Sequence, residues 1–178
     1  MSVAISRGAS PARALAGALG LASLAALGAA CTAPADGPSS GSYTVTFPST
    51  AAAVATDTVQ LSLFDVPEGQ ERNDFCQSLI QGRKRKDEQK PVVQNAPVNI
   101  CEMLAGRRPI DVPYGEKAVL AIAQRKGVDF MSGCAIQTFG DGDAPLEIRL
   151  ALVDVVVPVP ETTCASVGDF CQMKCPAP

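Results

Sequence analysis

The chain has 178 residues, with 15 Lys and Arg against 18 Asp and Glu and no His, which gives a formal charge of −3 at pH 7. A net negative charge argues against a nucleic-acid-binding protein, because such proteins usually present a basic surface. The absence of histidine excludes Ser-His-Asp and Cys-His catalytic groups.

Residues 1–30 are expected to be a signal peptide. Arg7 and Arg13 precede a charge-free run, residues 14–30, and a basic start, an apolar stretch and a small-residue exit are typical of a secretory signal. The run has 17 residues, with five Leu as its only large apolar side chains. A membrane-spanning helix needs about 20 strongly apolar residues, so removal of this segment is favoured over a permanent anchor.

Cys31 follows this run directly. Residues 27–31, Leu-Gly-Ala-Ala-Cys, resemble the lipobox of bacterial lipoprotein precursors, although that family usually has leucine where this chain has Gly28. The resemblance implies that Cys31 is lipidated and that the protein is held at a membrane of the cell envelope. The alternative is ordinary cleavage after Ala35, which would discard Cys31. Residues 31–42, rich in Pro, Gly and Ser, are expected to be a flexible tether.

Without its first 30 residues the chain keeps 148, enough for one domain, residues 43–178, with a sizeable core. It then carries 13 basic and 18 acidic side chains, a formal charge of −5. An even number of cysteines in an exported chain predicts disulfides. The six that remain are Cys76, Cys101, Cys134, Cys164, Cys171 and Cys175.

The body is expected to be mainly β. In residues 58–66, Val59, Leu61 and Leu63 alternate with polar side chains, the period-two pattern of a half-buried strand. Arg125-Lys126-Gly127 is predicted to be a hairpin turn. The predicted strands are residues 43–47, 58–66, 117–124, 128–131 with a continuation at 134–138, and 146–157.

An insertion, residues 67–111, separates the second and third strands. It has two predicted helical patches, residues 73–80 ended by Gly82 and residues 99–105 ended by Gly106. Each patch holds one cysteine, so we expect a bridge between Cys76 and Cys101, whose loop of about 25 residues would stabilise the fold by about 3 kcal/mol.

The tail, residues 161–178, holds three cysteines, and Ser166 is placed to cap a short helical turn. We expect Cys134 to pair with Cys164, and Cys171 with Cys175. The spacing of the tail cysteines matches no standard zinc site, and no metal or cofactor is expected.

Residues 112–115, Val-Pro-Tyr-Gly, precede a strand, and Gly127 precedes another. Over residues 43–158 apart from the insertion, this pattern resembles bacterial surface domains of immunoglobulin-like or prealbumin-like topology. The resemblance implies an antiparallel β-sandwich that serves as an adhesive, carrier or scaffold module, and it transfers no catalytic residue to this chain.

The densest charge cluster, which we call the basic run, is Arg83, Lys84, Arg85 and Lys86. It is a local positive spot on an acidic body and is a candidate contact for anionic lipid headgroups or surface polysaccharide. The alternative is a solvated, protease-sensitive loop. A second candidate, Asp141-Gly142-Asp143, has the composition of a calcium loop, but it is too short and is expected to be a solvated turn.

The leading functional hypothesis is a lipid-anchored, non-enzymatic envelope protein. It would contact an envelope protein or an anionic surface polymer through residues 67–111. One alternative is a disulfide-rich protease inhibitor that presents the basic run to a trypsin-like enzyme. Another is a hydrolase with paired carboxylates.

Overall fold

The computed structural model describes residues 2–4, 40–106, 109–154 and 158–175. The predicted signal peptide and tether, including Cys31, lie outside these ranges except for residues 2–4 and 40–42. The described chain is mainly β, as the sequence indicates, with four helices.

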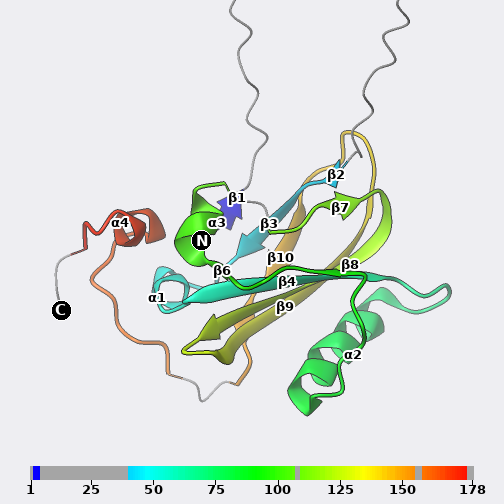
Figure 1. Ribbon diagram of the computed structural model, residues 1–178, viewed down its shortest axis with the longest axis horizontal. Coiled ribbons are helices and arrows are strands. Elements are labelled where there is room, and N and C mark those ends of the chain that lie inside the picture. Colours follow the sequence, from blue (N-terminus) through cyan, green and yellow to red (C-terminus); the bar gives the residue numbers. More distant parts are fainter. Residues whose placement is uncertain (1, 5–39, 107–108, 155–157, 176–178) are drawn as a thin grey trace, which may run out of the picture.

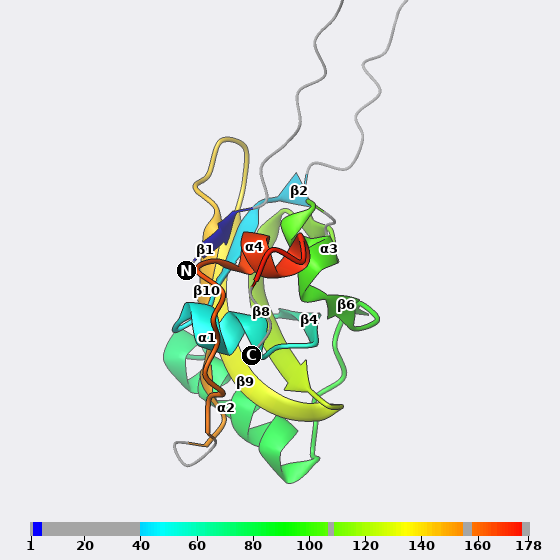
Figure 2. The same ribbon diagram turned by 90° about the vertical axis from the view of Figure 1, so that its left-hand side faces the viewer.

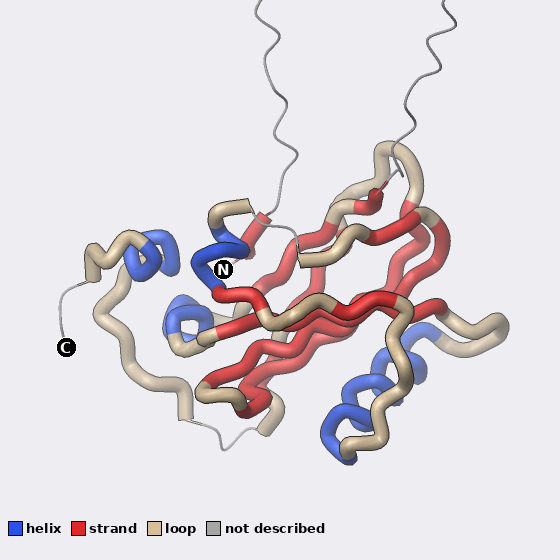
Figure 3. Tube along the Cα trace, in the orientation of Figure 1, coloured by secondary structure: helices blue, strands red, loops and turns tan. Residues whose placement is uncertain are grey.

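The larger sheet has six strands in the order β11-β9-β8-β4-β5, and β6 also pairs with β4. Its centre is an antiparallel meander, since β4 pairs with β8 and β8 with β9 (Figures 1 and 3). The predicted turn is confirmed, because both Lys126 (φ 51°) and Gly127 (φ 74°) adopt the positive φ of a tight two-residue hairpin. The strands are β4 (Thr58–Asp65), β5 (Val93–Gln94), β6 (Val98–Asn99), β8 (Gly115–Arg125), β9 (Val128–Phe139) and β11 (Ala151–Leu152).

A smaller sheet has the order β1-β3-β10. Strand β3 is antiparallel to β1 but parallel to β10, which corrects the expectation of purely antiparallel pairing. Two further short strands, β2 and β7, pair with each other. The bounds are β1 (Ser2–Ala4), β2 (Ser40–Gly41), β3 (Tyr43–Thr46), β7 (Val112–Pro113) and β10 (Leu146–Arg149).

The strand predicted over residues 146–157 is divided between the two sheets. Its first part, β10, pairs with β3, whereas β11 pairs with β9. The crossing depends on Gly133 in β9, where a Cβ atom would lie 2.3 Å from the carbonyl oxygen of Arg149. Because glycine has no side chain, the two backbones can pass this closely. Residues 155–157 lie outside the described part of the chain.

The main core joins one face of the larger sheet to β3, β10 and three short helices (Figure 2). Val59, Leu61 and Leu63 of β4 are fully buried there, as the period-two pattern predicts. The strand is not half-buried throughout, however, because Ser62 and Phe64 on its other face are buried as well. Ser166 caps the last helix by accepting the backbone N–H of Asp169 at 3.0 Å, as expected. These helices are α1 (Thr50–Val54), α3 (Ile100–Leu104) and α4 (Val167–Cys171).

Helix α2 (Arg72–Arg85) covers the opposite face of the larger sheet (Figure 1). Its Phe75 and Leu79 pack with Phe64 of β4 and Leu120 of β8 in a second apolar cluster. The helix continues past Gly82, the predicted stop. At Gly82 a Cβ would lie 2.7 Å from the carbonyl oxygen of Asp87, so the chain folds back closely over this glycine after the helix ends.

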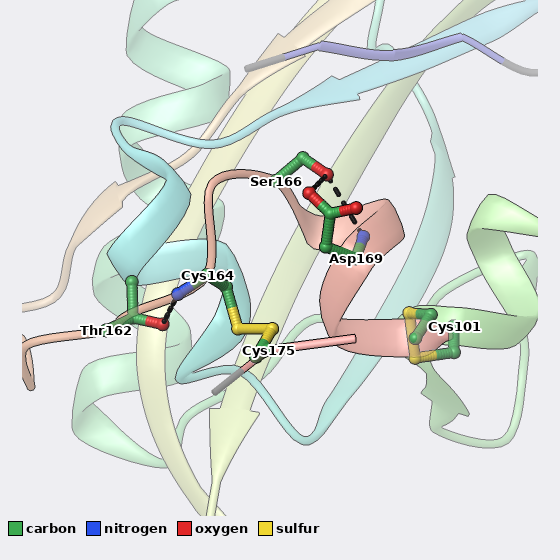
Figure 4. Close-up of a disulfide and its surroundings, with 7 residues drawn as sticks. Cys101, Thr162, Cys164, Ser166, Asp169 and Cys175 are labelled. Atoms are coloured by element: carbon green, nitrogen blue, oxygen red, sulfur yellow. Dashed lines mark hydrogen bonds between the residues drawn. A yellow bond between two sulfur atoms is a disulfide. The ribbon is translucent and has the colours of Figure 1, made fainter. Parts of the chain in front are cut away.

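The six cysteines form three disulfides, but all three expected pairings are wrong. Helix α2 lies on the face of the sheet opposite to α3, so Cys76 cannot reach Cys101 and instead bonds a cysteine of β9 beneath it. Helices α3 and α4 lie together and are bridged, and the third bond closes the tail (Figure 4). The bonds are Cys76–Cys134, Cys101–Cys171 and Cys164–Cys175, with Cα–Cα distances of 5.4, 5.3 and 4.9 Å.

Candidate binding site beside helix α2

A pocket of about 590 Å³ lies between the C-terminal half of α2 and the β8–β9 hairpin; we call it the α2 pocket. Helix α2 reaches this position because Phe75 and Leu79 are buried on the sheet and Cys76 is bonded to β9. The charged lining residues are Arg83, Lys84, Lys86, Glu88 and Asp129, and the others include Ile80, Ile122, Val128, Ser132 and Val153.

Arg83 connects the helix to the hairpin. Its Nε and Nη2 donate to the two carboxylate oxygens of Asp129 at 2.6 and 3.0 Å. Its Nη1 donates to both carboxylate oxygens of Glu88 at 2.9 and 3.0 Å. Gln124 adds a donor to Asp129 at 3.1 Å. A two-point contact between guanidinium and carboxylate fixes direction as well as distance, so Arg83 holds the end of α2 in one orientation over the hairpin.

Both members of this ion pair are held in their charged forms. The hydrogen bond to Asp129 raises the pKa of Arg83 above its ordinary value, with Glu88 contributing in the same direction and partial burial opposing it. The hydrogen bond from Arg83 lowers the pKa of Asp129 below its ordinary 3.8, against the effect of partial burial. The side chains are 22% and 26% exposed, so water screens the pair only in part.

The α2 pocket has an excess of positive charge. Its two carboxylates, Glu88 and Asp129, are both bonded to Arg83. Lys84 and Lys86 are exposed, and neither side chain has an ion-pair or hydrogen-bond partner among the residues that the structure describes. The three basic and two acidic lining residues leave a net charge of +1, and the two lysine ammonium groups are the cations not bonded to a carboxylate, which favours an anionic ligand.

The basic run predicted from the sequence is thus divided by the fold. It is not a loop, because Arg83, Lys84 and Arg85 form the last turn of α2 and Lys86 is its left-handed C-cap. Three members line the α2 pocket and Arg85 does not. Sequence reasoning missed the hairpin side of the pocket, where Val128 and Asp129 lie. The one signal in the sequence was Val128, a β-branched apolar residue directly after a turn. In the structure this residue is 68% exposed.

The other sequence candidates lie elsewhere. Asp141 and Gly142 form a turn between β9 and β10, and the Tyr114 hydroxyl donates to the Asp141 carboxylate. Over residues 40–106, 109–154 and 158–175, no three His, Cys, Asp or Glu side chains gather closely enough to hold a metal ion. A second hollow of about 400 Å³ lies beside the Cys101–Cys171 bond and has no charged residue in its lining.

No helix in the described part of the chain has the length and apolar character needed to cross a bilayer. In the comparisons with known proteins, no family model, curated protein or solved structure matches this chain.

Proposed function

We propose that the protein is an exported, lipid-anchored module of the bacterial cell envelope that binds an anionic ligand in the α2 pocket and catalyses no reaction. The observation that carries the binding role is a net charge of +1 at a pocket whose carboxylates are both bonded to Arg83, so that Lys84 and Lys86 have no ion-pair partner among the described residues. Export is supported by the signal-like start, by Cys31 at its exit and by six cysteines paired as three disulfides.

The α2 pocket suits ligand binding because its walls are already fixed. Three independent contacts hold α2 on the sheet: the Cys76–Cys134 bond, the apolar cluster around Phe75 and Leu79, and the Arg83 ion pair. A preformed site loses less conformational freedom when it binds. An immunoglobulin-like or prealbumin-like topology belongs to the same proposal, supported by two sheets that share one core.

The alternatives receive less support from this geometry. A protease binds its inhibitor as an extended segment, whereas three residues of the basic run are helical. A glycosidase-type hydrolase needs one carboxylic acid that holds its proton near neutral pH. In the α2 pocket both carboxylates bond Arg83, and the pKa of Asp129 is lowered rather than raised.

The binding role is tested with the native protein purified from the envelope. Inorganic phosphate, a polyuronate and vesicles of anionic phospholipid are titrated at low and high salt. We expect at least one anion to bind, salt to weaken binding, and the double variant Lys84→Gln/Lys86→Gln to weaken it further. Arg85→Gln is the matched control, since Arg85 belongs to the same run but does not line the pocket. Equal effects of the two variants, or no binding by any anion, would contradict the proposal.

The envelope assignment is tested separately by cell fractionation and by the mass of the N-terminal peptide. We expect a diacylglycerol-modified Cys31 in the membrane fraction. A full-length chain with an unmodified Cys31 in the cytosol would contradict it, and trypsin inhibition at nanomolar protein would instead favour the inhibitor alternative.

A further inference from the structure

We propose that the ligand of the α2 pocket is a single-chain anionic amphiphile, a carboxylate or phosphate head on an aliphatic tail. This inference rests on the anion-binding role proposed above and specifies its ligand class. It comes from the division of the pocket into a cationic rim and an aliphatic wall.

The aliphatic wall is assembled from four segments that are distant in sequence. Ile80 comes from α2, Ile122 from β8, Val128 from the start of β9 and Val153 from the chain after β11. Ile122 is buried in the cluster beneath α2, and Ile80 packs at the edge of the same cluster. Val128 is part of this wall, yet it is 68% exposed. An alkyl chain laid here would extend an existing apolar cluster and remove the exposed surface of Val128 from water.

The cationic rim suits a compact anionic head. Arg83 is not the main contributor, because its positive charge is already balanced by Asp129 and Glu88, to which its Nε, Nη1 and Nη2 donate. Lys84 and Lys86 remain, each a point charge on a flexible stem that can follow a small head group. The lining contains no aromatic ring and only one hydroxyl side chain, Ser132. That composition fits a charged head and a hydrocarbon tail better than the many hydroxyl groups of a polysaccharide.

The test is a series of monomeric n-alkyl carboxylates titrated into the native protein below their critical micelle concentrations. We expect acetate to bind weakly and affinity to rise about fourfold for each added methylene that is buried, until the wall is covered. Octanoate should bind more tightly than octyl glucoside, which has a tail of the same length but no charge. Vesicles of anionic phospholipid form a separate arm, which distinguishes binding of a single-chain amphiphile within the pocket from contact with a membrane surface.

Substitutions in the rim and in the wall separate the two contributions. Replacing each lysine, Lys84→Gln and Lys86→Gln, should lower dodecanoate affinity about fivefold, while Arg85→Gln leaves it unchanged. Val128→Ser should lower dodecanoate affinity about tenfold and leave acetate binding unchanged. Val128 is exposed, so this substitution does not disturb the core, and retention of the far-ultraviolet circular dichroism spectrum verifies the fold.

The outcomes distinguish the amphiphile inference from the anion-binding role on which it rests. If the polyuronate or phosphate binds through the lysines but affinity does not rise from acetate to dodecanoate, the amphiphile is wrong while the anion-binding role stands. If only vesicles bind, the contact is with a membrane surface rather than within the pocket, and the inference is again wrong. If no anion binds at all, both fail.

Discussion

Removing the Cys76–Cys134 bond should cost more stability than removing any local crosslink of this chain. The bond joins α2 to β9 across 58 residues, whereas Cys164–Cys175 spans only 11. In the chain-entropy model, closing loops of these lengths stabilises the folded state by roughly 4 and 3 kcal/mol respectively. The loops of Cys76–Cys134 and Cys101–Cys171 overlap, so these figures are upper values and are not additive.

The assay is urea unfolding of the oxidised protein, followed by circular dichroism. The double variant Cys76→Ala/Cys134→Ala is compared with the control Cys164→Ala/Cys175→Ala, and both cysteines are replaced each time so that no free thiol can exchange. We expect both variants to fold and the first to lose more free energy of unfolding. If the two double variants lost the same free energy of unfolding, or if Cys164→Ala/Cys175→Ala lost more, the reasoning that the long-range bond holds α2 beside the pocket would be refuted.

Three further outcomes follow from the same structure. Asp129→Asn should lower the free energy of unfolding by about 1 kcal/mol at pH 7. Because the folded-state pKa of Asp129 is depressed, this contribution is full above pH 3.8 and is lost as the pH falls through the folded pKa. The free energies of urea unfolding of the native protein and of the variant should therefore converge in acid. Gly133→Ala should cost about 1–3 kcal/mol because its Cβ would clash with the backbone of Arg149. The control Gly168→Ala, at a helical glycine whose Cβ would make only an ordinary contact with the Ser166 side chain, should be neutral or stabilising in the same unfolding assay. The proposed removal of residues 1–30 would take away β1. The backbone amide of Val45, which pairs with Val3, should therefore exchange hydrogen faster in a chain that lacks residues 1–30 than in the full chain, and unchanged exchange would contradict the pairing.

The sheet was predictable wherever one face of a strand is buried. Val59, Leu61 and Leu63 alternate with polar residues, and the strand lies where that pattern indicates. Residues 119–123 are instead continuously apolar, because the main core covers one face of β8 and α2 covers the other. That run indicates that some element covers the second face of β8, but it does not identify α2 as that element.

Disulfide pairing could not be derived from spacing. Two short helices that are neighbours in sequence invited a bond between Cys76 and Cys101, yet the helices pack on opposite faces of the sheet. Which face a helix covers is decided by the summed burial of its apolar side chains against residues far away in the chain. A local pattern carries no information about that partner surface.

The candidate site was predictable by half. The basic run is visible in the sequence as a charge cluster, but the sequence does not show which of its members are ion-paired and which line the pocket. Lys84 and Lys86 become available only because Arg83 is committed to Asp129, 46 residues further along the chain. Helix α1, a short Ala-rich segment capped by Ser49, was not predicted, because five residues give too little periodicity to detect.

The account depends on a domain that folds outside the cytosol around three defined disulfides. Non-reduced peptide mapping of the native protein from the envelope tests this most directly. The structure predicts the linked peptides Cys76–Cys134, Cys101–Cys171 and Cys164–Cys175. Free thiols at these positions, or a peptide linking Cys76 to Cys101, would contradict the account, because either result would remove the bond that holds α2 beside its pocket.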